Sequence, residues 1–359
     1  MLGVSWIDLF GHLVLSSGLG FEINSKQLLM NTTNKKQRKT DPPASTESRK
    51  TGRCRAGNGQ QTRDGIIIVD KESGPSSFRI VKKIKNLIKV KKAGHAGTLD
   101  PFATGILVVL LNQGTKLSHF FMSQDKVYKA SLRLGIETDT QDLTGRIINN
   151  KDIGSLTYKT IKHKALQLIG TIKQVPPSYS AIHHNGKRAY ELARSGIAID
   201  LQPRDVRVDY INILSVDLPT VWFEVGCSSG TYIRTLAADL GRSLGIGAHL
   251  TSLRRIKSGP FHVDDALTLI QIAQQLSNNT IDEVIIPLRN ALKGMMEVEI
   301  PDKLARKIRK GYQPNWGELS LENVLSFNSN DYLKAVTGEE LVAILKEDKN
   351  GYNIIRVFT

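Results

Sequence analysis

Apolar residues along the middle of the chain follow two different periods, one typical of strands and one typical of helices. A continuous apolar run at 66–69 ends in Asp70, Lys71 and a Gly-Pro-Ser-Ser turn, so it predicts a short buried strand. From 80 to 88 the apolar residues recur at helical spacing, which predicts an amphipathic helix. Other runs predict a buried element at 106–111, strands at 130–134, 211–216 and 221–227, and helices at 158–169, 187–194, 233–244 and 266–276.

These elements alternate irregularly, and no glycine-rich turn between a strand and a helix has the spacing of a dinucleotide or P-loop motif. We therefore expect a mixed α+β domain over residues 64–295. The pattern changes near residue 296. A short helical stretch at 304–308 precedes alternating segments at 332–336, 341–345 and 352–358, with turns at Gly338 and Asn350-Gly351. Residues 296–359 are expected to form a small β-rich domain.

The first 63 residues differ in composition from the rest. Residues 1–30 have no basic stretch before their apolar part, which makes them a poor secretory signal. Residues 31–63 hold nine Lys and Arg against Asp41 and Glu47, with too little apolar surface to offset the entropy of ordering. We predict a disordered basic extension over 1–63. Three origins stay open: an over-extended start with Met30 as the true start, an organelle transit peptide, and an arm that contacts RNA.

Charge is the most unusual bulk property of the 359 residues, because 49 Lys and Arg against 34 Asp and Glu give a net charge of +15. Such an excess favours a polyanionic partner, since each phosphate that is neutralised releases condensed counterions. Seven Lys and Arg at 79–92 occur without one acid, which indicates a phosphate-facing helix surface. Two cysteines in unrelated contexts favour a reducing, intracellular compartment, and no run approaches the roughly twenty apolar residues of a membrane span.

The clearest candidate for chemistry is Asp100, in the segment 94–103 (GHAGTLDPFA). Pro101 restricts Asp100 to extended backbone, and Gly94 and Gly97 permit a tight loop, so a buried element would present a single acid. One isolated carboxylate suits a nucleophile or general base better than a metal site, which needs several converging ligands. The eight histidines and two cysteines form no convincing ligand cluster in the sequence, so no metal site is expected.

Nine motifs, in order, resemble those of the TruB-type tRNA pseudouridine synthases from about residue 64 to 295, and the resemblance continues more loosely to the C-terminus. They lie at 70–77 (DKESGPSS), 94–105 (GHAGTLDPFATG), 126–128 (KVY), 134–142 (LGIETDTQD), 176–181 (PPSYSA), 186–191 (GKRAYE), 227–235 (CSSGTYIRT), 247–250 (GAHL) and 253–255 (LRR). Each motif alone is a weak signal, whereas nine at family-like spacing are a strong one. Two departures are visible: Glu72 stands where the family usually has proline, and the N-terminal extension has no counterpart in minimal bacterial members.

The resemblance implies an isomerase that converts a T-loop uridine of tRNA, uridine 55, to pseudouridine. The N-glycosidic bond breaks, the flipped uracil turns in its pocket, and C5 is rejoined to the ribose without any cofactor. The resemblance also implies a pseudouridine-synthase catalytic domain at 64–295 and a PUA-like RNA-binding domain at 296–359 that grips the acceptor-stem side. We expect tRNA as partner, no guide RNA, no membrane, and a monomer in the cytoplasm unless the extension targets an organelle.

The same resemblance assigns roles to residues of this chain. Asp100 is the expected nucleophile, and Arg234 the expected cation that keeps it ionised, because burial alone would raise the carboxyl pKa. Tyr128 and Tyr232 are expected to line the pocket and restore stacking to the flipped base, with Tyr128 also handling the C5 proton. The other expected contacts are His95 with the opened T-loop, Leu253 with the uracil, and Lys71, Lys82, Lys85, Lys89 and Arg254 with the RNA backbone.

Three other functions would leave different features in the sequence. An RNA-binding chaperone that folds tRNA without catalysis would show a decayed catalytic position, but Asp100, Tyr128 and Arg234 are all present, and the two activities can coexist. A guide-RNA-dependent relative from box H/ACA particles would have a fuller C-terminal barrel and basic tails, against which the short tail after residue 345 argues. A zinc base deaminase is excluded, because its Cys-x-x-Cys and His-x-Glu motifs are missing.

Overall fold

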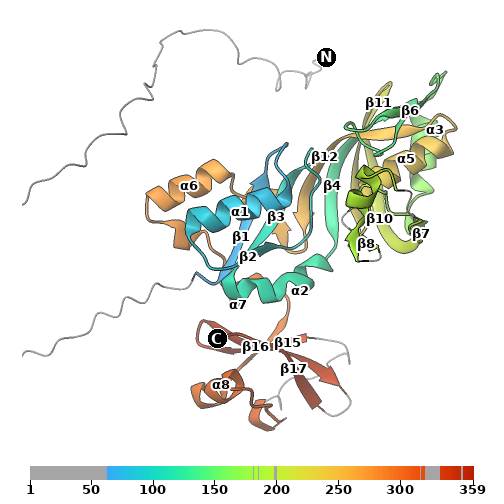
Figure 1. Ribbon diagram of the computed structural model, residues 1–359. Coiled ribbons are helices and arrows are strands. Elements are labelled where there is room, and N and C mark those ends of the chain that lie inside the picture. Colours follow the sequence, from blue (N-terminus) through green and yellow to red (C-terminus); the bar gives the residue numbers. More distant parts are fainter. Residues whose placement is uncertain are drawn as a thin grey trace, which may run out of the picture. The chain divides into compact units, whose positions relative to one another are not determined.

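The computed structural model describes residues 63–180, 182–184, 186–197, 200–315, 317–319, 332–348 and 351–359, and its largest feature is a mixed sheet (Figure 1). The strands of this sheet are β1 (Gly65–Lys71), β2 (Ala93–His95), β3 (Thr104–Leu111), β4 (Lys126–Leu134), β7 (Gly170–Gln174), β10 (Arg204–Asp217), β11 (Thr220–Cys227), β12 (Ala248–Ser258) and β13 (Phe261–His262). Among the described residues these nine strands join in the order β1-β3-β12-β4-β11-β10-β7, with β2 beside β3 and β13 beside β12. All of these pairs are antiparallel except β3 with β12.

Helices and two small strand pairs surround this sheet. The strand pairs are β5 (Ile136–Thr138) with β6 (Ile147–Asn150), and β8 (His183–His184) with β9 (Lys187–Arg188). The α-helices are α1 (Ser77–Ile88), α2 (Ser118–Met122), α3 (Tyr158–Leu166), α4 (Ala189–Arg194), α5 (Ile233–Ser243), α6 (Leu269–Ser277), α7 (Leu288–Ala291) and α8 (Asp302–Arg309). Short 3₁₀ helices occupy Asn112–Leu117, Val263–Asp265, Ile281–Glu283 and Gly317–Leu319.

The β1–β3 end of the sheet is buried on both faces. Ile67 and Val69 of β1 pack with residues of α1 and α6, whereas Ile66 and Ile68 pack with residues of α2 and α7. A strand that is covered on both faces carries a continuous apolar run instead of an alternating one. The predicted buried strand at 66–69 is therefore confirmed, and the buried element at 106–111 is most of β3.

The other half of the sheet packs under different helices. Leu236 and Leu240 of α5 and Ile161 of α3 share one core cluster with β4, β10, β11 and β12. The two halves meet where β3 and β12 run in parallel, with Thr104 opposite Arg254 and Gly105 opposite Arg255. Gly105 has φ +97°, and a Cβ there would lie 2.3 Å from the carbonyl oxygen of Arg255, so only glycine fits this seam.

Helix α1 displays its polar face to solvent. Ser76 caps its N-terminus by accepting a hydrogen bond from the backbone N–H of Arg79, and the helix ends at Lys89, which adopts a left-handed conformation with φ 58°. Ile80, Ile84 and Ile88 are buried, whereas the lysines between them are exposed. The helical spacing read from the sequence thus separates a core-facing apolar stripe from a cationic face.

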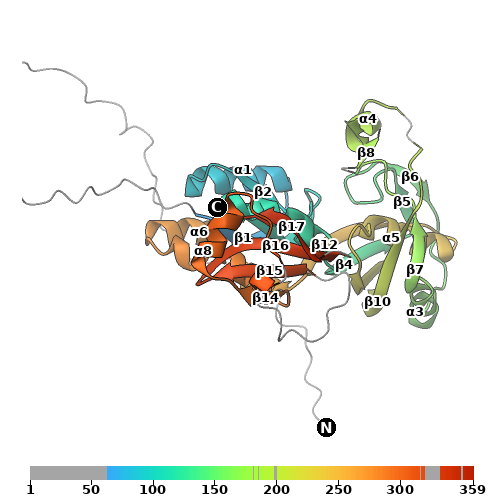
Figure 2. The ribbon, with the colours of Figure 1, turned by 90° about the horizontal axis from the view of Figure 1, so that it is seen from below.

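A second sheet forms a small β domain near the C-terminus (Figure 2). Its strands are β14 (Met296–Glu299), β15 (Tyr332–Thr337), β16 (Glu340–Asp348) and β17 (Gly351–Val357), in that order, with only β14 and β15 parallel among the described residues. Ile308 of α8 and Leu333 and Leu345 of the strands contribute to its own apolar core. Phe120 of α2 meets Tyr332 edge to face, with ring centroids 5.0 Å apart, which joins this domain to the larger one.

The mixed α+β class with a small β-rich C-terminal domain is confirmed, and several element bounds differ. Strand β12 was not predicted, and β10 is much longer than 211–216. The helix expected at 187–194 begins at 189, because residues 187–188 pair with 183–184 instead. The helix expected at 266–276 begins at 269, where Thr268 and Gln271 form a capping box.

The expected extension over 1–63 lies outside the described residues apart from Arg63. The Arg63 Nε lies 2.8 Å from an Asp282 carboxylate oxygen, which ties the start of the described chain to the helical region after α6. Within the described segments, every helix is too short or too polar to cross a membrane.

Candidate active site

Asp100 lies on the loop between β2 and β3, and buried groups hold this loop from behind. The Lys71 ammonium donates hydrogen bonds to the carbonyl oxygens of Pro101 at 3.0 Å, Ala103 at 2.6 Å and Glu72 at 2.9 Å. The Ser77 hydroxyl donates to the Leu99 carbonyl at 3.0 Å and accepts from the Leu99 N–H at 2.9 Å. Strand β1 and helix α1 therefore fix the backbone on both sides of the acid.

Arg255 of β12 holds the same loop from the other half of the sheet. Its guanidinium donates to the carbonyl oxygens of Ile106 at 2.8 Å, Gly97 at 3.2 Å and Thr98 at 3.5 Å. Only 1% of Arg255 is exposed to solvent. The buried cation thereby supplies hydrogen-bond donors to backbone carbonyl oxygens that would otherwise lack a partner.

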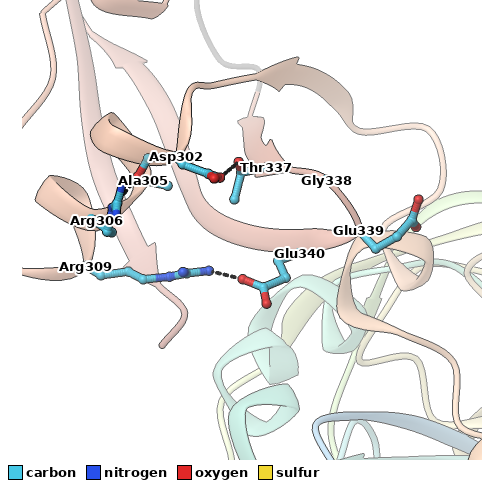
Figure 3. A pocket seen from close by; sticks show the side chains of 8 residues that line it. All are labelled: Asp302, Ala305, Arg306, Arg309, Thr337, Gly338, Glu339 and Glu340. Atoms are coloured by element: carbon cyan, nitrogen blue, oxygen red, sulfur yellow. Dashed lines mark hydrogen bonds and ion pairs between the residues drawn. The ribbon is translucent and has the colours of Figure 1, made fainter.

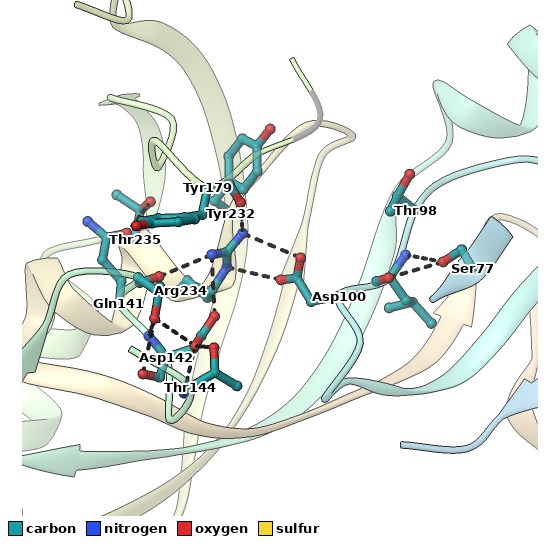
Figure 4. A network of polar contacts seen from close by, with 12 residues as sticks. Ser77, Thr98, Asp100, Gln141, Asp142, Thr144, Tyr179, Tyr232, Arg234 and Thr235 are labelled. Atoms are coloured by element: carbon teal, nitrogen blue, oxygen red, sulfur yellow. Dashed lines mark hydrogen bonds and ion pairs between the residues drawn. The ribbon is translucent and has the colours of Figure 1, made fainter. Parts of the chain in front are cut away.

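The carboxylate of Asp100 faces the guanidinium of Arg234 in a two-point contact (Figure 4). Arg234 Nε lies 3.0 Å from Asp100 Oδ2, and Arg234 Nη2 donates to Asp100 Oδ1 at 3.4 Å. The Arg234 side chain is 4% exposed and the Asp100 side chain is 32% exposed. The acid is thus held by a buried cation while remaining open to solvent, which is the arrangement that the sequence predicted.

Arg234 is itself fixed by groups on the side away from Asp100 (Figure 4). Its Nη1 donates to Asp142 Oδ2 at 3.3 Å and to the Thr140 carbonyl at 3.0 Å, and Nη2 donates to the Tyr179 carbonyl at 2.9 Å. Asp142 Oδ1 accepts from the Thr140 hydroxyl at 2.7 Å, the Thr144 N–H at 2.9 Å and the Thr144 hydroxyl at 2.6 Å. The guanidinium therefore has one orientation, set between two carboxylates.

Opposing effects act on the pKa of Asp100. Burial raises its carboxyl pKa above the usual range, the Arg234 guanidinium opposes that rise, and the Asp142 carboxylate adds to it. The net shift is upward. A carboxylate with a raised pKa is more basic and more nucleophilic than a free aspartate once it is ionised.

Two other candidate residues lie on adjacent strands beside the loop. Tyr128 of β4 is the register partner of Arg255 on β12, and Leu253 of β12 is the partner of Ala130 on β4. Both side chains are largely buried, at 9% and 8% exposed. Burial raises the pKa of the Tyr128 phenol, and among the charges that act on it are Arg255, which lowers the pKa, and Asp100, which raises it.

Tyr232 and His95 are the two remaining residues that the family motifs assign to substrate binding. Tyr232 caps the N-terminus of α5, directly before Ile233 and Arg234, and the Arg204 guanidinium lies 4.9 Å from the centroid of its ring. One face of Tyr232 is therefore already used by a cation. His95 ends β2, where it pairs with Val109, and it is partly exposed.

The candidate RNA contacts divide into two groups. Lys82, Lys85 and Lys89 are exposed on or just after α1. The prediction that Lys71 contacts the RNA backbone is wrong, because this side chain is fully buried and all of its hydrogen bonds go to loop carbonyls. Arg254 is held by Asp70, with nitrogen–oxygen distances of 2.7 Å and 3.0 Å, and 41% of its side chain is exposed.

Two surface hollows lie away from Asp100. A cleft of about 670 Å³ is lined by the end of α1, the 3₁₀ helix after β3 and the C-terminal Thr359, and its cations include Lys89, Lys91, Lys92 and Lys116. A second hollow, in the small β domain, is lined by both cations and acids, and Arg309 pairs there with Glu340 at 2.5 Å (Figure 3). In the described part of the chain, no three His, Cys, Asp or Glu side chains gather as a metal site requires.

The sequence analysis did not identify the residues that hold Arg234 in place beside Asp100. Asp142, Thr140 and Tyr179 lie inside the family-like motifs at 134–142 and 176–181, but the motifs alone assign them no contact with Arg234. Asp142 is 92 residues from Arg234, so their contact depends on the tertiary fold. The available signal was a cluster of short hydroxyl and acid residues, which is typical of a hydrogen-bonded turn.

Two family models and several curated relatives match this chain. Residues 85–233 match the family described as TruB family pseudouridylate synthase, N-terminal domain, and residues 234–295 match the tRNA pseudouridylate synthase B C-terminal domain. The tRNA pseudouridine synthase B of Syntrophus aciditrophicus (strain SB) is 41% identical over 285 residues, which cover 79% of this chain and 91% of the relative. That of Syntrophotalea carbinolica (strain DSM 2380 / NBRC 103641 / GraBd1) is 35% identical over 302 residues, covering 82% and 98%.

Among solved structures, a Cbf5–Nop10–Gar1 complex contains a chain that is similar to this one with a TM-score of 0.65 and 26% identity, over 83% of this chain and 86% of that chain. The fold, the motifs and these matches define an RNA-modifying isomerase. The chain belongs to the TruB family of pseudouridylate synthases.

Proposed function

We propose that this enzyme isomerises uridine 55 in the T-loop of tRNA to pseudouridine, with Asp100 as the nucleophile. The observation that carries this proposal is the two-point contact between the accessible Asp100 carboxylate and the buried Arg234 guanidinium. The names of the relatives support tRNA as the substrate, since each is a tRNA pseudouridine synthase B.

The chemistry needs an ionised carboxylate at an atom of the nucleoside. Asp100 attacks either the ribose C1′ or the base C6, or it assists elimination, and Arg234 keeps it aimed and ionised during that step. Because the guanidinium is anchored by Asp142 and by two backbone carbonyls, little reorganisation accompanies the reaction. Isomerisation conserves all atoms of the nucleoside, so the residues named here supply everything that this proposal requires.

The uridine must leave the stack of its loop to reach Asp100. Flipping a base costs a few kcal/mol, and less from a loop than from a duplex. Tyr128 and the open face of Tyr232 are proposed to recover part of this cost by stacking, and Leu253 by apolar contact with the uracil. His95 is proposed to steady the opened T-loop.

The rest of the RNA is proposed to lie on the cationic surface formed by α1 and the neighbouring cleft. Lys82, Lys85 and Lys89 are exposed there without an acid on the same helix, and Lys91, Lys92 and Lys116 extend the surface into the cleft. Recognition by shape and phosphate contacts fits a folded RNA loop. Residues 296–359 are proposed as a PUA-like module for the acceptor-stem side, and the enzyme is proposed to act as a monomer without a guide RNA.

Incubating the purified protein with an unmodified tRNA transcript and mapping pseudouridine chemically tests this function. Pseudouridine is expected at position 55 with no added RNA or protein, and a transcript with cytidine at position 55 should remain unmodified. Modification only when a guide RNA is added, or binding of tRNA without any modification, would contradict the proposal. The second result would leave an RNA chaperone as the function.

A further inference from the structure

Arg255 is a buried cation without a counter-ion. It is 1% exposed, and among the described residues no carboxylate lies within ion-pair distance of its guanidinium. Its hydrogen bonds to Ile106, Gly97 and Thr98 go to neutral carbonyl oxygens. Arginine is rarely so fully buried unless it is paired, so its charge acts on whatever polar group lies beside it.

The group beside it is the phenol of Tyr128. Arg255 and Tyr128 are directly opposite in the antiparallel pairing of β12 with β4, so their side chains leave the sheet on the same face. The register shifts immediately after this pair, between Arg255 and Lys257, and such a bulge re-aims a side chain. Among the charged groups that act on the phenol pKa, Arg255 has the largest effect and lowers it, as expected for neighbouring side chains.

We propose that Arg255 is a positioning residue for the isomerisation, which acts through Tyr128 by donating a hydrogen bond to the phenol oxygen and so directing the phenol hydrogen toward the bound base. This inference rests on the proposed function. A guanidinium donates hydrogen bonds and accepts none, so the phenol oxygen must be the acceptor in this contact. The phenol hydrogen is then free for another partner.

Such a phenol can perform the proton exchange that the isomerisation requires. Breaking the glycosidic bond leaves N1 of the uracil with an electron pair, and joining C5 to the ribose leaves a hydrogen on C5 that must depart as a proton. The phenol gives its proton to N1, and the phenolate then takes the proton from C5, which restores the phenol. Proton and electron counts balance, and the Arg255 charge stabilises the phenolate between the two transfers.

The charges around Tyr128 determine the expected pH dependence. Arg255 on β12 lowers the phenol pKa, whereas Cys227 on β11 and Asp100 on the loop raise it, and burial raises it most. Removing the guanidinium hydrogen bond should therefore move the phenol pKa further upward. The phenolate then becomes harder to form, and the proton exchange slows.

A double-mutant cycle tests the proposal. Arg255→Lys keeps a buried cation but loses the planar guanidinium, whose several N–H groups can reach the loop carbonyls and the phenol at once. Tyr128→Phe removes only the hydroxyl. Each is expected to lower the single-turnover rate by about 10-fold or more. The loss in the double variant should be smaller than the product of the two single losses, because the part of the Arg255 effect that passes through Tyr128 is already gone. If the two losses multiply, Arg255 does not act through Tyr128.

A matched control separates positioning from stability. Lys126 is another buried cation, 6% exposed, which donates hydrogen bonds to the carbonyl oxygens of Phe121 and Met122 at the end of α2. Lys126→Gln should lower the melting temperature, and its rate loss, if any, should multiply with that of Tyr128→Phe. If the rate losses of Lys126→Gln and Tyr128→Phe also fail to multiply, the double-mutant cycle measures general destabilisation and the proposal is overturned.

A second measurement applies even where Arg255→Lys does not fold. The ¹⁵N signals of the Arg255 guanidinium, assigned with specific labels, should shift in Tyr128→Phe, which changes only one hydroxyl. In a folded Arg255 variant, the ¹³Cζ signal of Tyr128 should titrate at higher pH than in the unaltered enzyme. Unshifted guanidinium signals would contradict the contact. Absence of pseudouridine formation by the unaltered enzyme would instead contradict the proposed function, so the two failures are distinguishable.

Discussion

Replacing Asp142 with Asn tests how far the buried side of the Arg234 pair controls the reaction. Asn keeps the shape, and its carbonyl oxygen accepts the three hydrogen bonds from Thr140 and Thr144 at 2.7 Å, 2.9 Å and 2.6 Å. Its NH₂ group would then face Arg234 Nη1, where the carboxylate oxygen now lies at 3.3 Å. Two N–H donors would meet between side chains that are 4% and 5% exposed.

The size of the effect follows from what is lost and what remains. A hydrogen bond to a charged group contributes about 1.5–3 kcal/mol, whereas breaking a fully buried ion pair costs about 3–5 kcal/mol. Arg234 keeps Asp100 and the carbonyls of Thr140 and Tyr179, so we expect a loss of about 2–3 kcal/mol in the free energy of unfolding. A guanidinium that shifts by a fraction of an ångström misaligns Asp100, which should lower the single-turnover rate about 10- to 100-fold.

The pH dependence of the reaction rate provides an independent test of the role of Asp142. The Asp142 carboxylate raises the pKa of Asp100, so removing its charge should lower that pKa. In the proposed mechanism Asp100 acts only when ionised, so activity should be lost as the pH falls through its pKa. The acid limb of the rate profile should therefore move to lower pH in Asp142→Asn, although the maximal rate is smaller.

Release of tritium from C5 of labelled uridine in a T-arm RNA measures the rate, and thermal unfolding measures the stability. Asp239→Asn on the same helix as Arg234 is the matched control, since Asp239 pairs with Arg242 at 2.6 Å on the protein surface. That control should keep nearly the full rate. A full rate in Asp142→Asn, or an equal loss in Asp239→Asn, would refute the reasoning.

Further predictions concern the nucleophile, the buried lysines and the cationic surface. Asp100→Asn should abolish tritium release and leave RNA binding intact. It should also raise the melting temperature at neutral pH, because a carboxyl whose folded pKa is raised destabilises the fold once ionised; a lower melting temperature would contradict the upward shift. Burial lowers the pKa of Lys71 to about 8 from 10.5, so the unfolded chain holds this proton more tightly than the folded chain. The free energy of unfolding should therefore rise with pH between those two values, and this rise should be absent in Lys71→Met. Equal pH slopes for the two proteins would count against this prediction. Lys82→Ala and Lys89→Ala should each reduce the slope of log Kd against log salt by about 0.7–0.9, and unchanged slopes would exclude these lysines as phosphate contacts.

Sequence patterns identify those strands and helices whose burial can be read from their own run of residues. Strands β1 and β3 are covered on both faces, so their apolar runs are continuous and readable. Strand β12 carries Arg254 and Arg255 in its centre, and two arginines do not resemble a strand interior. Its place between β3 and β4 depends on partners more than a hundred residues away in the chain, which no local window contains.

Contacts between residues that are distant in the sequence also limit what can be predicted of the candidate active site. Asp100 and Arg234 are identified by family motifs, and the structure joins them. Lys71 follows an acid and precedes a turn, which is typical of an exposed strand end, yet the pairing of β1 with β3 turns it inward. The contact of Asp142 with Arg234 likewise requires the tertiary fold, so the sequence indicates which residues carry the chemistry better than which residues hold them.

The seam between β3 and β12 has a consequence for how the enzyme matures. Asp100 belongs to the half of the sheet built from the early strands, and Arg234 belongs to the half that is completed later in the chain. A folding intermediate with only one half formed would contain either the acid or its cation, never both as a pair. On the roles proposed for Asp100 and Arg234, activity therefore requires both halves of the sheet to be formed and joined at this seam.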